Sequence, residues 1–382
     1  MGYFETKDKY RAWLPPEKIE AAALAQINAL IQLPGLFQWA AIMPDVHPGF
    51  GMPIGGVAAF VDKACPNAVG VDIGCGVMAV KTNLEAAKIR SKLASIIQSL
   101  LSAIPVGFAK RNQPLPSSLW QRVPQEKILI REMKNARLQL GTLGGGNHFI
   151  EVQEDPQGAI WLMLHSGSRN LGKQVADYYN RQAKDWCLQE GQPFPTALAW
   201  LPTDSPKGRD YLVAMDFCLN FAAENRRQMA DIALATLNKF FAVDRIETVE
   251  TVHNFAAWET HFSHRVLVHR KGAVPARGLV VIPGSMGTYS YIGQGLANPA
   301  SFASCSHGAG RVLGRSEAKR LLNRKQVLAE LKEKSIILLS PDRDSVVEEA
   351  SAAYKDLDEV MDYQRDLVTP LVKLRPLAVL KG

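Results

Sequence analysis

Five residues between positions 72 and 253 have metal-ligating side chains and stand beside glycine or asparagine. Asp72 and Cys75 lie in GVDIGCG, His148 in GGGNH, His165 in LHSGS and His253 in VHN. His165 and His253 each end a run typical of a strand, which would offer their imidazoles from a rigid sheet. One carboxylate, one thiolate and three imidazoles are too many donors for a single catalytic zinc ion with an open position. The set suits two ions that share the thiolate.

A sixth residue of this kind, His307, lies in SCSHGAGR at residues 304–311. Neither a helix nor a strand favours these glycines, so the stretch predicts a tight turn that presents the imidazole. Asp45 and His47, in MPDVHPGFGMPIGG, are expected to shape the site rather than to bind metal. Arg169 and Arg311 are interpreted as phosphate clamps, because a guanidinium fork fits that geometry.

Glycine is clustered along the chain. Of the 29 glycines, 20 fall within the segments 49–76, 141–146, 167–172, 284–295 and 308–314. Such turns can aim backbone N–H groups at an anion, and LGGGNH, PGSMG and HGAG are candidates for a phosphate cradle. The chain has no GxxxxGK[ST] motif, and no GxGxxG follows a strand and opens a helix. A bound nucleotide would therefore occupy a non-standard cradle.

The elements that must position these residues are mixed along the chain. Helical periodicity covers 16–32, 83–103 (with Asn83 as N-cap), 206–241, 316–333 and 355–370. Short apolar runs predict strands at 56–61, 76–82, 148–153, 159–164, 264–269, 277–283, 335–340 and 376–381. Helices and strands do not alternate in a regular βαβ order, so the fold class is α+β.

Composition excludes several classes of protein. The 382 residues have a net charge of +7 and 47% hydrophobic residues, a proportion ordinary for a globular protein. No apolar run approaches the roughly 18–20 residues of a membrane span, and the charged N-terminus is unlike a signal peptide. The five cysteines are scattered without a CxxC pair, which predicts no disulfide framework and a cytoplasmic location. The positive charge fits a polyanionic partner, but also an ordinary enzyme with a basic face.

Taken in order, nine motifs resemble those of the RtcB family of RNA-splicing and RNA-repair ligases. They are MPDVHPGFGMPIGG, GVDIGCG, GGGNHFIEVQ, HSGSRNLG, HNFA, HRKGA, PGSMGTYSY, SHGAGR and LAVLKG. The resemblance implies one RtcB-like catalytic domain over residues 1–382, with mixed sheets around a central active-site cleft. It also implies an RNA ligase that joins 2′,3′-cyclic phosphate or 3′-phosphate ends to 5′-hydroxyl ends, in tRNA splicing or RNA repair.

The resemblance further implies GTP as co-substrate, two Mn²⁺ ions per chain and a histidine–GMP intermediate at His307. Asp72, Cys75 and His148 would hold one ion. Cys75, His165 and His253 would hold the other, with Cys75 bridging. The GTP-binding residues implied are Asn147, His148, Phe149, Ile150, Glu151, His253, Asn254, Pro283, Gly284, Ser285, Met286, Ser290, His307, Gly308, Ala309, Gly310 and Lys381. Donor chemistry alone would favour zinc, so the assignment of manganese rests on the resemblance.

The expected partners are RNA with these ends and an archease-type activator, without a membrane. Two alternatives stay open at this point. One is a metal-dependent phosphoesterase or 3′-end guanylyl-capping enzyme on the same scaffold. The other is a non-catalytic RNA-binding protein, which is less favoured because every metal ligand and the histidine nucleophile are present.

Overall fold

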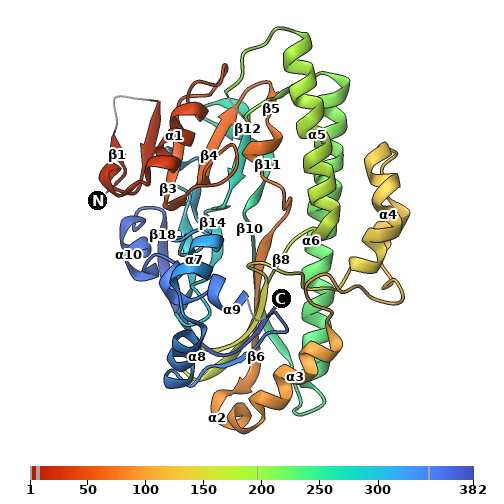
Figure 1. Ribbon diagram of the computed structural model, residues 1–382, viewed down its shortest axis with the longest axis vertical. Helices are drawn as coiled ribbons and strands as arrows, with labels where there is room; N and C mark the ends of the chain where they lie inside the picture. The colour runs from red at the N-terminus through yellow and green to blue at the C-terminus, as the bar shows by residue number, and fades with distance from the viewer. Residues whose placement is uncertain (1, 6–8, 196, 343–344) are drawn as a thin grey trace.

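The computed structural model describes residues 2–5, 9–195, 197–342 and 345–382, and it combines two large sheets with α-helices (Figure 1). The α+β class predicted from the sequence is confirmed. Each of the eight predicted strands overlaps a strand of the structure. The assignment of residues 1–382 to one domain stays a prediction.

The first sheet has six strands and is mixed, since β2 and β3 pair in parallel and the other pairs are antiparallel. Its order is β1 (Phe4–Glu5), β2 (Tyr10–Ala12), β3 (Ala40–His47), β4 (Ile54–Phe60), β12 (His264–Lys271) and β11 (Asn254–His261). Two small sheets stand beside it: β13 (Ala273–Pro275) with β16 (Ser304–Ser306), and β5 (Lys63–Ala64) with β9 (Leu201–Pro202).

The second sheet carries most of the site. Its order is β10 (Arg245–Val252), β6 (Gly76–Glu85), β8 (Ala159–Ser166), β7 (Phe149–Glu154), β18 (Val368–Lys381), β15 (Ser290–Leu296) and β14 (Arg277–Ile282), with β17 (Ile337–Leu339) on β18. The edge strands β10 and β14 approach each other, and the hydroxyl of Thr251 donates to the carbonyl of Val281. The sheet therefore curls into a nearly closed barrel.

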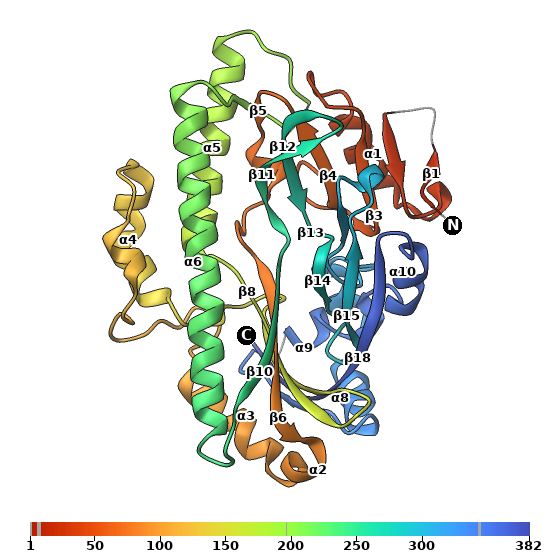
Figure 2. The same ribbon diagram turned by 180° about the vertical axis from the view of Figure 1, so that it is seen from behind.

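Helices cover the outside of these sheets. They are α1 (Ala21–Leu30), α2 (Ala86–Ile89), α3 (Leu93–Ala103), α4 (Lys127–Gln139), α5 (Arg169–Gln189), α6 (Pro206–Leu237), α7 (Arg315–Leu321), α8 (Arg324–Glu333), α9 (Ser345–Glu348) and α10 (Leu357–Tyr363). The long helices α5 and α6 lie side by side along one flank of the molecule, as Figures 1 and 2 show. None of the helices described is long and apolar enough to cross a membrane.

Helix α6 is the scaffold for the site. It begins at Ser205, whose hydroxyl accepts from the N–H of Gly208, and Pro206 occupies its first turn. Along its length Met229 and Leu237 pack with Leu162 and Leu164 of β8 in one buried apolar cluster. Burial of such side chains stabilises the fold by roughly 1.5–3 kcal/mol each. The helix thus holds the back of the sheet that carries the site.

The predicted helix at 83–103 is wrong at its start. Asn83 lies in β6, and helix begins only at Ala86, before a 3₁₀ turn leads into α3. The amide of Asn83 bonds the backbone N–H and the carboxylate of Asp244, which ties the end of β6 to the turn before β10. A tertiary contact therefore overrides the local N-cap signal.

Three other predicted helices are interrupted. The segment 16–32 divides into a 3₁₀ turn at Pro16–Lys18 and α1. The segment 316–333 divides into α7 and α8, because the Asn323 side chain accepts from the N–H of Lys325 and caps a new helix. The segment 355–370 yields only α10, after which the chain becomes β18 at Val368. That strand pairs with β15 and β7, and this pairing is invisible to local periodicity.

Candidate metal and nucleotide site

Four neighbouring strands bring four of the predicted metal ligands to one end of the second sheet. Cys75 immediately precedes β6, His148 precedes β7, His165 lies near the end of β8, and His253 follows β10. All these pairs are antiparallel, so the start of one strand lies beside the end of the next. The backbone N–H of His253 donates to the carbonyl of Cys75 over 2.9 Å. The strand order β10-β6-β8-β7 therefore assembles the cluster.

The ligand atoms form a continuous chain of contacts with Cys75 at its centre. The Sγ of Cys75 lies 3.4 Å from Nε2 of His148 and 3.3 Å from Nε2 of His165. The Nε2 of His148 is 3.0 Å from Oδ2 of Asp72. The Nε2 of His165 is 3.4 Å from Nε2 of His253. All five predicted ligands are thus brought together, and three of them keep their donor atoms within 4.8 Å of one another.

Backbone carbonyls orient two of these imidazoles. The Nδ1 of His148 bonds the carbonyl of Leu143 at 3.0 Å, and the Nδ1 of His165 bonds that of Asn147 at 3.1 Å. A carbonyl can only accept, so each Nδ1 carries the proton and the lone pair of each neutral ring lies on Nε2. Both lone pairs face the Cys75 sulfur, which is the tautomer that a metal site requires.

Electrostatics keep the imidazoles neutral. Burial lowers the pKa of His148, and it lowers the pKa of His165 and His253 well below the ordinary value. Burial and the neighbouring Asp72 raise the pKa of the Cys75 thiol well above its ordinary range. Burial acts to raise the pKa of Asp72 too, but the nearby His148 ring and Arg169 guanidinium are among the effects that hold it below its usual value.

The donor set fits divalent cations. A thiolate, imidazoles and a carboxylate converge, and nothing in the described part of the chain bonds the buried Oδ1 of Asp72 or Nδ1 of His253. A cation would also offset the cost of a buried thiolate. The residues therefore fit a metal centre.

Sequence reasoning missed two residues of α6 that brace this centre. The buried guanidinium of Arg226 donates to the carbonyls of Gly74 and Ser166, on either side of the cluster, and pairs with Glu250. The amide of Asn225 bonds the backbone of Gly141, Thr142 and Gly167. Nothing near them in sequence signals this role, since both lie inside a long helix.

The interpretation of Arg169 as a phosphate clamp stays a prediction, and the structure shows a structural role for its guanidinium. Its guanidinium donates to the hydroxyl of Thr142 and to the carbonyl of Gly107, and so joins two loops. It passes so close to Gly144 that a Cβ there would lie 1.9 Å from Nη1. Gly144 also has a φ of +92°, so glycine is required at this position.

His307 lies next to the metal centre. It follows β16, and its ring centroid is 4.8 Å from that of His253. The Oδ2 of Asp45, in β3, accepts from the Nδ1 of His307 at 2.6 Å and from its backbone N–H at 3.1 Å. Gly310 lets the two segments approach, because its φ is +74° and a Cβ would lie 2.2 Å from the Asp45 carbonyl. Asp45 thus shapes the site, as predicted, by holding the ring.

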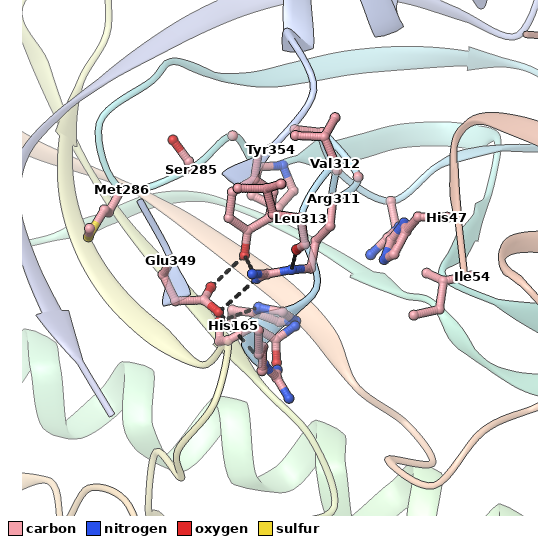
Figure 3. Close-up of a pocket in the computed structure, with 18 of the residues that line it drawn as sticks. His47, Ile54, His165, Ser285, Met286, Arg311, Val312, Leu313, Glu349 and Tyr354 are labelled. Carbon is pink, nitrogen blue, oxygen red and sulfur yellow. Dashed lines mark hydrogen bonds and ion pairs between the residues drawn. The ribbon is translucent and has the colours of Figure 1, made fainter. Parts of the chain in front are cut away.

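His307 lines a cavity of about 370 Å³. Figure 3 shows this cavity with His47, His165 and Glu349 among its labelled lining residues. This volume lies within the usual range for small-molecule sites. Twelve of the seventeen predicted GTP-binding residues line it: Asn147, Phe149, Glu151, Pro283, Gly284, Ser285, Met286, His307, Gly308, Ala309, Gly310 and Lys381. The HGAG and PGSM turns therefore face one space, together with the residues that flank His148.

Five predicted GTP-binding residues do not line the cavity. His148 and His253 belong to the metal cluster, and Ile150 is a core residue of β7. Asn254 bonds the backbone of Asp72 and Gly272, and the Ser290 hydroxyl accepts from the N–H of Gly284. Asn254 and Ser290 thus support the site from behind.

Burial shifts the pKa values of two ionisable residues that line the cavity. It raises the pKa of Glu151 to about 8 and lowers the pKa of Lys381. The Nζ of Lys381 donates to the carbonyl of His148 and lies 3.7 Å from the carboxylate of Glu349. A buried carboxyl and a buried ammonium group in one pocket can recognise a base through hydrogen bonds.

The cavity wall also contains residues that sequence reasoning missed or misassigned. Arg311 lines the wall, but its guanidinium bonds Glu349, the hydroxyl of Tyr354 and two backbone carbonyls, so its interpretation as a phosphate clamp is not supported (Figure 3). Tyr354 in turn donates to Glu349. Glu349 and Tyr354 lie outside every glycine cluster, so only the fold reveals them.

Known proteins of similar sequence carry the names of RNA-splicing or tRNA-splicing ligases. The family model described as "tRNA-splicing ligase RtcB" matches residues 26–128 and 117–382. The chain is similar to two RNA-splicing ligases of Escherichia coli, RtcB1 of strain ATCC 25922 (35% identical) and RtcB of strain K12 (34%), with 97% of both chains covered each time. It is also 32% identical to the tRNA-splicing ligase RtcB of Thermococcus kodakarensis, over 94% of this chain and 91% of that protein.

Proposed function

The chain belongs to the RtcB family and is an RNA ligase, and from this premise we propose that it joins RNA ends with GTP and Mn²⁺. The RNA ends would be a 2′,3′-cyclic phosphate or 3′-phosphate and a 5′-hydroxyl, in tRNA splicing or RNA repair. The observation that carries the proposal is the convergence of His307, the metal cluster and the cavity on one space.

Two Mn²⁺ ions per chain would occupy the metal cluster. Asp72, Cys75 and His148 would hold one, and Cys75, His165 and His253 the other. The ions would supply positive charge beside the reacting phosphates. The short contacts of Cys75 with both His148 and His165 support a bridging thiolate.

His307 would act as the nucleophile. The Asp45 carboxylate holds the proton on Nδ1, which leaves the lone pair of Nε2 free to attack the α-phosphorus of GTP. A nitrogen–phosphorus bond forms while the bond to the β-phosphate oxygen breaks, and pyrophosphate leaves. The cavity residues Glu151 and Lys381 would bind the guanine, and the HGAG and PGSM turns would surround the rest of the nucleotide.

The bound GMP would then activate the RNA. A 2′,3′-cyclic phosphate is first opened by water to a 3′-phosphate. An oxygen of that phosphate attacks the phosphorus of His307–GMP, and the nitrogen–phosphorus bond breaks. The 5′-hydroxyl oxygen then attacks the RNA 3′-phosphorus, its proton passes to solvent, and GMP leaves. An archease-type activator remains part of the prediction.

The role of Asp45 yields a testable prediction. In Asp45→Asn the carboxylate charge that favours a protonated Nδ1 is lost, so we expect the rate of GMP attachment to fall about 100-fold. The rate can be measured with α-labelled GTP and Mn²⁺ in the absence of RNA. Asp62→Asn removes an exposed carboxylate from the bend between β4 and β5 and should leave the rate unchanged. Equal rates for Asp45→Asn and the unaltered protein would contradict this role.

The proposed function as a whole is tested by joining RNA ends. One strand ends in a 2′,3′-cyclic phosphate, its partner begins with a 5′-hydroxyl, and GTP is supplied or withheld. We expect joined product only with both GTP and Mn²⁺. Covalent GMP without joining would favour a capping enzyme, and loss of the terminal phosphate without GTP would favour a phosphoesterase.

A further inference from the structure

Phe108 is the most exposed large apolar residue in the described part of the chain, with a relative exposure of 102%. Its neighbours Ala109 and Lys110 are exposed as well. Single exposed apolar residues are common, but a phenyl ring without packing partners carries a large unburied apolar surface. The position of its loop determines what this ring can contact.

The loop that carries Phe108 is fixed to the turn before the metal centre. The N–H of Gly107 donates to the carbonyl of Gly144 at 2.9 Å, and the N–H of Leu143 donates to the carbonyl of Pro105 at 2.9 Å. The guanidinium of Arg169 donates to the carbonyl of Gly107 at 3.0 Å.

Beyond the ring the loop is fixed again. The N–H of Arg111 donates to the carbonyl of Leu138, and its guanidinium donates to the carbonyls of Leu140 and Gly141. Anchors on both sides of Phe108 thus lead to segment 138–144, which runs directly into Asn147 and His148. The ring is therefore presented on a fixed backbone, and its anchor Gly144 lies four residues before His148.

An exposed ring on a fixed loop, with a lysine two residues away, is what single-stranded nucleic acid binding uses. Bases stack on aromatic faces, and ammonium groups pair with phosphates. The net charge of +7 of the whole chain favours a polyanionic partner. Because the loop is already ordered, little conformational entropy of the protein is lost when a base stacks there.

We propose that Phe108 is a stacking platform for an unpaired base of the RNA strand whose end occupies the site. The inference rests on the proposed ligase function, since it assigns how that site holds its RNA. Lys110 lies two residues from Phe108 in the same exposed loop, and its Nζ, which bonds the side-chain oxygen of Asn135, stays exposed and can pair with an RNA phosphate. The platform would bind RNA without reading its sequence, because every base has a face to stack.

The test compares Phe108→Ala, Phe108→Trp and Leu188→Ala. Leu188 is an equally apolar exposed residue near the far end of α5, about 30 Å along the helix from Arg169. We expect Phe108→Ala to raise the KM for RNA about 10-fold, the effect of losing one stacked base. Phe108→Trp should restore the KM, and Leu188→Ala should not change it. GMP attachment without RNA should be equal in all of them, since no RNA is present.

A binding assay makes the result independent of catalysis. Oligonucleotides carry 2-aminopurine within the last two positions of the 3′-phosphate strand or the first two of the 5′-hydroxyl strand. Binding should quench one of these probes, and the quench should disappear in Phe108→Ala and persist in Phe108→Trp. An unchanged KM and an unchanged quench in Phe108→Ala would overturn the platform. If the unaltered protein failed to take up GMP or to join ends, the proposed function would fail, while the quench would still test Phe108.

Discussion

His307→Ala should carry no protein-bound label after incubation with α-labelled GTP and Mn²⁺, and it should join no RNA ends. The imidazole is the group that receives GMP in the proposed reaction, and alanine has no nucleophilic atom to replace it. Among the described residues that line the cavity, the other imidazoles belong to His47 and His165. The Nδ1 of His165 is bonded to Asn147 and its Nε2 faces the metal cluster, so neither nitrogen is free to substitute. We expect loss of label to the limit of detection.

The chemistry of the label and a second variant complete this test. A phosphoramidate should be labile in acid and stable in alkali, unlike a phosphate ester. His264→Ala removes an exposed imidazole from the first position of β12 and should label normally. Label on the His307→Ala protein would refute the assignment of the nucleophile.

Cys75→Ala should lose both metal ions. The thiol lies between His148 and His165, and its removal takes one ligand from each proposed ion. The unaltered protein should hold two Mn²⁺ ions per chain after dialysis, measured by elemental analysis, and the variant should hold fewer than one. Joining activity should fall below detection, because the charge beside the reacting phosphates is lost.

The matched control is Cys187→Ala. Cys187 is equally buried, but it lies in α5 and its thiol bonds the carbonyl of Trp200. It should keep both ions and full activity. Two bound ions in Cys75→Ala would show that the thiolate does not bridge. Near-ultraviolet circular dichroism of both variants separates metal loss from unfolding.

The side chains of the candidate site could be predicted from the sequence because their types are rare and their neighbours distinctive. A cysteine among glycines, or a histidine after an apolar run, marks a position even when its partners are unknown. Their convergence could not be derived in this way, because it depends on the order β10-β6-β8-β7. Strand order depends on pairing between segments that are far apart in sequence, so it cannot be predicted from local periodicity.

The differences between prediction and structure have the same physical origin. Asn83 has the sequence signature of an N-cap, but its amide bonds Asp244, which is 161 residues away. The guanidinium groups of Arg169 and Arg311 have a shape that suits phosphate. In the structure, however, both donate to backbone carbonyls, and Arg311 also donates to the carboxylate of Glu349. Glu349 and Tyr354 could not be found at all, because neither stands in a glycine turn. Residue type and sequence neighbours thus indicate which side chains can react. The hydrogen-bond partners of a side chain in the fold determine whether it has a structural role instead.

The wide spacing of the site along the chain has a consequence for biosynthesis. His253 is the last of the five metal ligands to leave the ribosome, whereas His307 follows 54 residues later and Lys381 later still. A nascent chain therefore contains all five proposed metal donors before it contains either the proposed nucleophile or the strand β18, whose Lys381 bonds the carbonyl of His148. Vectorial synthesis thus completes the proposed metal centre in sequence before the proposed nucleophile is made.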